Sequence, residues 1–436
     1  MKVKIIGAGL AGSEAALQLA KRGIEVDLYE MRPVKMTGAH TTEKLAEFVC
    51  SNSMGSYDLS VASGLLKKEM ELLGSELIKI AFDVKVPAGN ALAIDREEFS
   101  KRVTELIEAN PLINLVREEV NEIPEGDVII ASGPLTSDSM AKSIQEFTQE
   151  EHLHFFDAVA PIVEKDSINF DKAFYGSRYD KGEASYINCP MNKEEYENFY
   201  NILINAERIE LKEFEKNAKF FESCLPVEVL GSRGVDTLRF GPMKPVGLVD
   251  KRTNEINYAV VQLRQDNALK TLYNLVGFQT NLKWSFQKEL IHSIPGLENA
   301  NIVRYGVMHR NTFINSPRIL TNKLNTKKRD NLFFAGQITG VEGYTESMAS
   351  GLIAGINMAK YIKGEQMLEM PSECILGALL NYITDENHKQ LQPVNSNWAL
   401  INNIELPKKI RKDKKAKAEI LANRSLEALS GVLNTL

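Results

Sequence analysis

The first 30 residues contain a strand, a glycine-rich turn, a helix and an acidic residue in the order of a dinucleotide-binding unit. A short apolar strand at residues 3–6 is followed directly by the turn Gly7-Ala8-Gly9-Leu10-Ala11-Gly12, and residues 13–21 have a helical composition. A second strand at residues 25–29 ends at Glu30. This pattern predicts a parallel α/β sheet with a dinucleotide diphosphate over the N-terminus of the first helix.

Each glycine of the turn has its own expected role. Gly7 allows the tight turn, Gly9 lets the backbone approach a pyrophosphate, and Gly12 allows close packing of helix on strand. Glu30 follows the glycines by roughly 20 residues, the spacing at which a carboxylate accepts hydrogen bonds from the ribose hydroxyls of an adenosine.

Two later segments fit the same domain. Residues 127–133 form an apolar strand that ends in small residues and Gly133. Residues 332–337 form another, which ends at Gly336 and Gln337 and is followed by Gly343 and a helix rich in small residues. Strands that end in glycine place backbone at the carboxyl edge of a parallel sheet, where ligands bind.

A nucleotide-binding fold built from both ends of the chain implies a domain inserted between them. We predict a dinucleotide-binding, Rossmann-like domain in two parts at residues 1–155 and 327–436. The inserted α+β domain is expected at residues 156–326, and the length of 436 residues suits such a composite.

The charge of the chain is unevenly distributed. The 52 Lys and Arg residues against 58 Asp and Glu give a net charge of −6, which argues against a cationic nucleic-acid-binding surface over the whole chain. Residues 404–420 run the other way, with seven basic residues against three acids. Such a run is commonly a solvated helix face, but it is also where the phosphates of a polyanion would be met. The basic residues are Lys408, Lys409, Arg411, Lys412, Lys414, Lys415 and Lys417.

The four cysteines are far apart and form no CxxC pair or zinc-type cluster with histidine. Free thiols fit a reducing cytoplasm, and no signal peptide or membrane-length apolar run is visible. We therefore expect a cytoplasmic protein with no metal site and no membrane partner.

Beyond the glycine turn, motifs along nearly the whole chain resemble those of the folate- and FAD-dependent tRNA (uracil-5-)-methyltransferases, the TrmFO family. The motifs are Gly7-Ala-Gly-Leu-Ala-Gly-Ser-Glu14, Tyr29-Glu-Met-Arg-Pro-Val34, Phe48-Val-Cys-Ser-Asn-Ser53, Val86-Pro-Ala-Gly89, Ile130-Ala-Ser-Gly-Pro-Leu135, Ser177-Arg-Tyr-Asp-Lys-Gly-Glu183, Asn188-Cys-Pro-Met191, Phe221-Glu-Ser-Cys-Leu-Pro-Val-Glu228, Phe240-Gly-Pro-Met-Lys-Pro-Val-Gly-Leu248, Gln262-Leu-Arg-Gln-Asp266, Tyr305-Gly-Val-Met-His-Arg-Asn-Thr-Phe-Ile-Asn-Ser-Pro317 and Phe334-Ala-Gly-Gln337. A related flavoprotein that modifies the wobble uridine shares the Ala-Gly-Gln motif but is much longer, so the length favours the methyltransferase.

The resemblance implies that the nucleotide-binding part is an FAD-binding, Rossmann-like domain of the glutathione-reductase type. It also implies a cytoplasmic flavoenzyme that methylates C5 of the T-loop uridine of tRNA and makes ribothymidine. It implies 5,10-methylenetetrahydrofolate as carbon donor, FAD as cofactor, NAD(P)H as reductant and tRNA, not DNA, as partner. The implied FAD contacts are Gly7, Ala8, Gly9, Leu10, Ala11, Gly12, Glu30, Arg32, Gly133, Gly336, Gln337 and Gly343.

The chemistry of uracil explains why cysteines matter. Uracil C5 becomes nucleophilic once a group adds to C6, and a thiolate can add there and leave again afterwards. By resemblance, Cys224 is the nucleophile and Cys50 is the base that removes the C5 proton. A thiol is only slightly ionised at neutral pH, so Cys224 needs a nearby cation, for which Lys244 and Arg233 are candidates.

One departure leaves alternatives open. The family carries an apolar residue and then Lys or Arg after Cys-Ser-Asn-Ser, whereas Met54-Gly55-Ser56 stands here. The same chemistry on a ribosomal-RNA uridine is therefore an alternative substrate. An FAD-dependent oxidoreductase acting on a small molecule and an RNA-binding flavoprotein without methyl transfer are further alternatives. Cys189 is expected to be structural or near the site, and Cys374 has no expected role.

Overall fold

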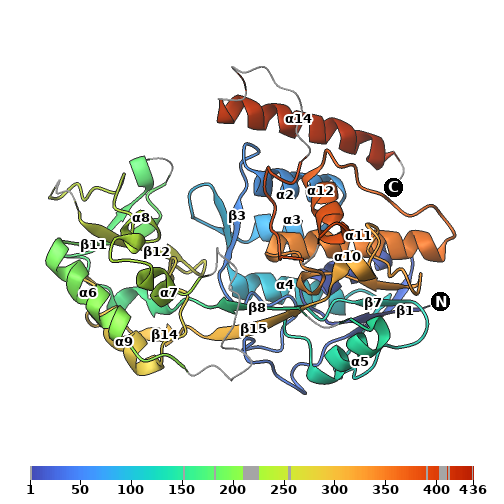
Figure 1. The fold of residues 1–436 in the computed structure, drawn as a ribbon, viewed down its shortest axis with the longest axis horizontal. Coiled ribbons are helices and arrows are strands. Elements are labelled where there is room, and N and C mark those ends of the chain that lie inside the picture. Colours follow the sequence, from blue (N-terminus) through green and yellow to red (C-terminus); the bar gives the residue numbers. More distant parts are fainter. Residues whose placement is uncertain are drawn as a thin grey trace.

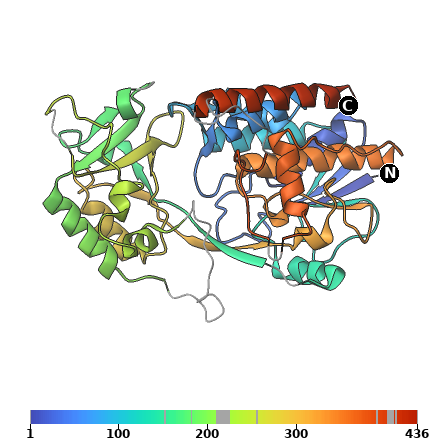
Figure 2. The same ribbon diagram turned by 45° about the horizontal axis from the view of Figure 1, so that its top comes forward.

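The chain folds into two bodies joined by a narrow ribbon, as Figure 1 shows. The computed structural model describes residues 2–150, 153–180, 183–209, 225–253, 257–388, 391–401, 410, 413–434 and 436. The ribbon pairs β8 (Leu153–Ala158) with β15 (Met308–Phe313) in antiparallel register, from Leu153 opposite Phe313 to Ala158 opposite Met308. Figure 2 shows the same ribbon as the connection between the bodies.

The larger body is built on a five-stranded parallel sheet. Its strand order is β16 (Leu332–Phe334), β7 (Val128–Ile130), β1 (Lys2–Ile6), β2 (Glu25–Tyr29) and β6 (Ile113–Val116). The predicted α/β fold with a Rossmann-like parallel sheet is confirmed. Strands that follow β1 in sequence lie on both sides of it, so the chain connections run in opposite directions from β1. This leaves a crevice at the carboxyl ends of β1 and β7, the place where such sheets bind ligands.

Helices from both ends of the chain cover this sheet. Helix α1 (Leu10–Lys21) packs against α11 (Tyr344–Ile362), the small-residue helix expected after Gly343. The approach is close, since a Cβ on Gly351 would lie 2.2 Å from the carbonyl oxygen of Ala11. The other elements of this body are a three-stranded sheet of β3 (Ser53–Ser56), β5 (Ala91–Ile94) and β4 (Lys85–Val86), with helices α2 (Ala62–Leu72), α3 (Glu76–Asp83), α4 (Arg96–Glu108), α5 (Asp138–Thr148), α10 (Ser316–Ile319), α12 (Ile375–Thr384) and α14 (Lys414–Leu433).

A buried carboxylate, Glu69, connects three of these helices. Glu69 lies on α2 and accepts hydrogen bonds from the backbone N–H groups of Ile375 and Leu376, at the start of α12, each at 2.8 Å. It also accepts one from Ser425 Oγ on α14 at 2.7 Å. Its complete burial raises the pKa of Glu69 to about 7, although these hydrogen bonds act in the opposite direction.

The smaller body is an antiparallel sheet of six strands with helices packed against it. The strand order is β10 (Phe174–Gly176), β11 (Tyr186–Met191), β12 (Ala259–Gln265), β13 (Leu272–Leu275), β9 (Ile162–Glu164) and β14 (Ile302–Arg304). The helices are α6 (Lys193–Asn205), α7 (Val227–Ser232), α8 (Thr237–Phe240) and α9 (Trp284–His292). Helix α6 begins with a reciprocal capping box between Asn192 and Glu195.

The two bodies have separate hydrophobic cores. The described core of the smaller body runs from Ala160 to Ala300, and Ile302 packs against it. Ile314 and Leu324 already belong to the core of the larger body. The chain therefore returns to the larger body at β15, earlier than the predicted boundary at 326, while the predicted division of the chain as a whole stays a prediction.

No described helix is both long enough and apolar enough to span a membrane.

Candidate cofactor and catalytic site

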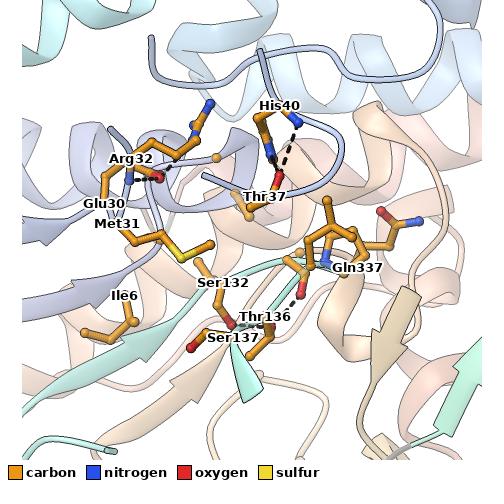
Figure 3. Close-up of a pocket in the computed structure, with 18 of the residues that line it drawn as sticks. Ile6, Glu30, Met31, Arg32, Thr37, His40, Ser132, Thr136, Ser137 and Gln337 are labelled. Carbon is orange, nitrogen blue, oxygen red and sulfur yellow. Dashed lines mark hydrogen bonds and ion pairs between the residues drawn. The ribbon is translucent and has the colours of Figure 1, made fainter. Parts of the chain in front are cut away.

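A cavity opens at the crevice beside β1, and Figure 3 shows side chains that line it. It encloses about 1040 Å³, including space open to solvent. Nine of the predicted FAD contacts line it: Gly7, Gly9, Leu10, Ala11, Glu30, Arg32, Gly133, Gly336 and Gln337. Ala8, Gly12 and Gly343 are not among its lining residues. The structure thus gathers most of the predicted contacts around one cavity.

Two glycines of the turn have different physical reasons to be glycine. A Cβ on Gly12 would lie 1.8 Å from the carbonyl oxygen of Gly7, so only glycine allows the helix to start this close to the strand. A Cβ on Gly9 would meet no atom within 4 Å, and its φ of −73° suits any residue. The open space at Gly9 faces the cavity, which fits a ligand that approaches the backbone there.

Glu30 is held in the cavity wall as an anion. One carboxylate oxygen accepts the backbone N–H of Ala8 at 3.1 Å, and the other accepts Arg32 Nε at 2.9 Å. Burial by itself would raise the pKa of Glu30, but the charge and hydrogen bonds of Arg32 outweigh it and hold that pKa below its ordinary value. Arg32 also donates to Glu47 at 2.9 Å, which fixes its guanidinium group in place. The fixed guanidinium orients Glu30, the acid that was predicted to meet a ribose.

The opposite wall of the cavity comes from the ends of β7 and β16. Ser132 Oγ and Thr136 Oγ1 lie 2.7 Å apart, and both residues are visible in Figure 3 beside Gln337. Gly336 has a φ of +85°, and its N–H donates to Ser350 Oγ on α11 at 2.7 Å. Gly343 precedes α11 with a φ of +114°, so it turns the chain from the cavity wall into that helix.

Cys50 lies at the edge of this cavity, in contact with a residue that lines it. Its backbone N–H donates to Tyr344 Oη at 2.8 Å, and its Sγ lies 2.9 Å from the same oxygen. Tyr344 is the first residue of α11 and lines the cavity. Burial is the main reason that the pKa of Tyr344 lies well above its ordinary value, and the nearby Cys50 raises that pKa further. Tyr344 is therefore a neutral phenol.

The smaller body holds the segment around Cys50, residues 48–53, which we call the Cys50 loop. Arg264 on β12 donates to Asn52 Oδ1 and to Ser51 Oγ, each at 3.1 Å. Asn52 in turn donates to the carbonyl oxygen of Gln265 at 2.9 Å. These contacts fix the Cys50 loop against the inserted domain.

Two further arginines contact the backbone of the same loop. Arg304 on β14 donates to the carbonyl oxygen of Val49 at 2.7 Å. Arg96, at the start of α4, donates to the carbonyl oxygen of Phe48 and forms an ion pair with Asp266. Tyr344, Arg96 and Arg304 carry no sequence signal that marks them as site residues. Arg264 and Asp266 lie in a family motif, but only the fold shows that Arg264 reaches the Cys50 loop and that Asp266 pairs with an arginine that does.

The second predicted catalytic cysteine, Cys224, lies outside the described residues, and its role stays a prediction. The described chain resumes at Leu225, which is buried, and enters α7 at Val227. Of the cations suggested for Cys224, Lys244 is exposed and Arg233 ends α7.

The other two cysteines are part of the hydrophobic cores. Cys189 is fully buried on β11, and burial raises its pKa far above that of a free thiol. Burial also raises the pKa of Cys374 to about 12, and its thiol donates to the carbonyl oxygen of Ser425 at 3.5 Å. Both are neutral thiols in packed surroundings, which favours the structural role expected for Cys189.

The unusual Met54-Gly55-Ser56 segment forms most of β3. Met54 is buried, and the amine of Lys67 on α2 donates to the carbonyl oxygens of Ser56 and Ser63, each at 3.0 Å. Burial lowers the pKa of Lys67 to about 8. A cation from α2 therefore lies beside the segment in which the family basic residue is missing.

The basic segment at 404–420 is described only in part. Lys408, Lys409, Arg411 and Lys412 lie outside the described residues, and Lys415 and Lys417 lie in the first turn of α14. The charge of Lys415 contributes to a lowered pKa of Asp58, for which the hydrogen bonds of Ser60 are the larger cause. The start of α14 is thus near the segment that follows β3. Within the described ranges, no group of three His, Cys, Asp or Glu residues is arranged to hold a metal ion.

A parallel sheet with a glycine turn, an anionic residue after β2 and a cavity at the switch point defines the class of dinucleotide-binding α/β proteins. Within this class, known proteins that resemble the chain indicate its family. A sequence model described as "Glucose inhibited division protein A" matches residues 2–366. Aquifex aeolicus GidA in its form II crystal has a TM-score of 0.70 over 99% of this chain and 74% of that chain, at 16% identity, which is a likeness of fold.

Curated relatives match at much higher identity. The "Methylenetetrahydrofolate--tRNA-(uracil-5-)-methyltransferase TrmFO" of Bacillus cytotoxicus is 57% identical over 432 residues, 99% of each chain. The protein of the same name from Anoxybacillus flavithermus is 57% identical over 436 residues, the full length of both. The chain belongs to the TrmFO group of the glucose-inhibited division protein A family, as its motifs predicted.

Proposed function

We propose that this chain is a methylenetetrahydrofolate- and FAD-dependent methyltransferase that acts on C5 of a uracil in tRNA. The observation that carries the proposal is 57% identity to TrmFO enzymes from end to end. The cavity beside the glycine turn supplies the independent structural support. The finer assignments, namely the T-loop uridine as target, NAD(P)H as reductant and the cytoplasm as location, follow from the resemblance of the motifs.

The cavity residues fit FAD. The free N–H groups at the start of α1 and the open space at Gly9 suit the pyrophosphate, and the ionised Glu30 suits the ribose hydroxyls. Gly336 and Gln337 lie across the cavity, where the flavin half would be held. When bound, FAD in its reduced form supplies the hydride that completes the methyl group.

The two cysteines have different roles toward the uracil: Cys224 is the nucleophile and Cys50 is the base. The Cys224 thiolate adds to C6, and the resulting enolate makes C5 nucleophilic toward the one-carbon unit. Cys50 then takes the proton from C5, and the electron pair of the resulting enolate expels the carrier of the one-carbon unit, which leaves an exocyclic methylene on C5. Addition of hydride to that methylene makes the methyl group, restores the C5–C6 double bond and expels Cys224 as a thiolate. Cys50 is suited to this role because it lies at the cavity edge through its contact with Tyr344.

The Met54-Gly55-Ser56 departure makes the RNA substrate the first property to test. We would incubate the FAD-loaded enzyme with labelled methylenetetrahydrofolate, NAD(P)H and either unmodified tRNA or ribosomal RNA. Label in the tRNA is expected. Label in ribosomal RNA alone would move the same chemistry to the alternative substrate, and NAD(P)H turnover with a small acceptor but no labelled RNA would favour the oxidoreductase.

A covalent trap tests the nucleophile separately. tRNA that contains 5-fluorouridine should form an adduct with the wild-type enzyme, and Cys224→Ala should lose that adduct while it retains FAD. Cys374→Ala is the matched control, since it removes a thiol of the core and should form the adduct. A normal yield of adduct in Cys224→Ala would show that another group attacks C6.

A further inference from the structure

The hydrogen bonds at Tyr344 Oη assign the donor in its contact with Cys50. The oxygen accepts the backbone N–H of Cys50 at 2.8 Å and that of Ser51 at 3.4 Å. A phenol oxygen has two acceptor positions and one proton, so these two contacts leave the O–H for the third neighbour. That neighbour is Cys50 Sγ at 2.9 Å. The hydroxyl therefore donates and the sulfur accepts.

The position of the hydroxyl is fixed by packing. Tyr344 is anchored as the first residue of α11, and its ring lies against Phe48, with ring centroids 4.1 Å apart. Phe48 is fully buried and contacts Phe99 edge to face at 5.1 Å. A hydroxyl held in this way is pre-organised to donate to the sulfur and needs no rearrangement when the sulfur becomes charged.

The surrounding charges also favour an anionic sulfur. Charged side chains contact the Cys50 loop or lie next to the residues that do. Arg96, Arg264 and Arg304 donate to the loop, and Asp266, just after β12, and Glu47, just before the loop, are the acids near them. Asp266 pairs with Arg96, and Glu47 pairs with Arg32. His40 lines the cavity, and its charge acts on Glu47. Positive charge near a thiol stabilises the thiolate.

We infer that Tyr344 is a positioning residue for Cys50: its hydroxyl donates a hydrogen bond to Sγ and keeps the side chain as a thiolate, ready to accept the C5 proton of the uracil. This inference rests on the proposed role of Cys50 as the base. In the step it serves, the C5–H bond breaks, its electron pair stays on the uracil as an enolate, and the proton forms the S–H bond of Cys50. Tyr344 keeps its own proton throughout.

The ionisation of Cys50 can be measured without catalysis. The FAD-loaded enzyme is alkylated with iodoacetamide between pH 5 and 10 in the absence of RNA, and mass spectrometry follows the peptide that contains Cys50, apart from the other cysteines. In the wild type, the rate should reach half its maximum below the ordinary thiol pKa of about 8.5. In Tyr344→Phe, the midpoint should rise by about one pH unit, a roughly tenfold loss of thiolate near neutral pH.

Controls separate the hydroxyl from the packing of the ring. Tyr344→Phe keeps the ring on Phe48, and flavin absorbance reports whether FAD is retained. Tyr382→Phe removes a phenol hydroxyl on α12 and should leave the midpoint unchanged. Methyl transfer by Tyr344→Phe should have a lower kcat near pH 7 that recovers toward pH 9, with KM for tRNA unchanged.

Two results have separate meanings. An unchanged or lower alkylation midpoint in Tyr344→Phe would overturn the positioning role, whatever the enzyme does with tRNA. Normal methyl transfer by Cys50→Ala would instead remove the proposed function of Cys50 and leave the measured hydrogen-bond effect standing.

Discussion

The two bodies contribute to the site in different ways. The larger body uses mainly backbone, namely the glycine turn, the N-terminus of α1 and the strand ends at Gly133 and Gly336. The smaller body uses long side chains, Arg264 and Arg304, which cross to the Cys50 loop of the other body. The glycine turn of the backbone site is encoded by residues close together in sequence, whereas the cross-body site exists only after both bodies have assembled.

The largest expected effect lies in the backbone site. Gly12→Ala would place a methyl group 1.8 Å from the carbonyl oxygen of Gly7. Because neither the strand nor the helix can move away without breaking the turn, we expect a loss of unfolding free energy of at least about 3 kcal/mol. Denaturant unfolding followed by circular dichroism measures it.

Gly9→Ala is the matched variant in the same turn. Its methyl group meets no protein atom within 4 Å, so the unfolding free energy of the apoprotein should change by less than about 1 kcal/mol. FAD affinity, measured by flavin fluorescence, should fall at least tenfold, since the methyl group fills the ligand space. Equal destabilisation by both variants would contradict the separate roles of the two glycines.

The cross-body site should respond next most strongly to Asp266→Ala. This change leaves Arg96 without its counter-ion in a nearly buried position and should cost about 3 kcal/mol of unfolding free energy. FAD binding should persist and methyl transfer should fall, because the Cys50 loop loses part of its support. Asp250→Ala, which breaks the pair with Arg252 inside the smaller body, is the control and should spare methyl transfer.

A pH effect of similar size or smaller is expected at Glu69, which serves neither site. Its folded pKa of about 7 exceeds the ordinary value of 4.5, so between these pH values the native protein holds a proton that the unfolded chain has released. Stability should therefore fall by up to about 3 kcal/mol as the pH rises from 4.5 to 7, and level off above.

Glu69→Gln should remove that part of the pH dependence. The comparison is the unfolding free energy of wild type and variant at pH 5 and pH 7.5. Glu98→Gln, on the exposed face of α4, removes a carboxyl whose pKa is lowered by its hydrogen bond to Arg102 and should leave the decline in place. An identical decline in Glu69→Gln would assign it to other groups.

The smallest effect is expected at the start of α14. The double variant Lys415→Gln, Lys417→Gln should weaken tRNA binding a few-fold. It should also reduce the slope of log affinity against log salt concentration by about one, the loss expected for one phosphate contact. Filter binding from 50 to 200 mM salt measures this. An unchanged slope would make these lysines a solvated helix face, the other interpretation of their charge.

The same contrast explains what the sequence could predict. Residues 3–30 specify the turn, the helix and Glu30 within one short segment, so the nucleotide-binding turn and its acid followed from pattern alone, and the resemblance added further contacts. Most other residues that line the cavity were not predicted. Cys50 was assigned by resemblance. Tyr344 is separated from it by nearly 300 residues, and neither propensity nor periodicity indicates which tyrosine will meet a given thiol. The predicted end of the inserted domain at residue 326 stays a prediction, and the pairing of β15 with β8 was not foreseen because it joins segments about 150 residues apart.

The contact between α1 and α11 also sets an order of events during synthesis. Ala11 meets Gly351 in the close approach that completes the larger body, so the first helix leaves the ribosome long before its partner exists. The smaller body, whose described core ends near Ile302, is complete in the nascent chain before α11 is made. The inserted domain can therefore fold first, and the cofactor cavity is complete only after Ser347, the last residue that lines it, has been made.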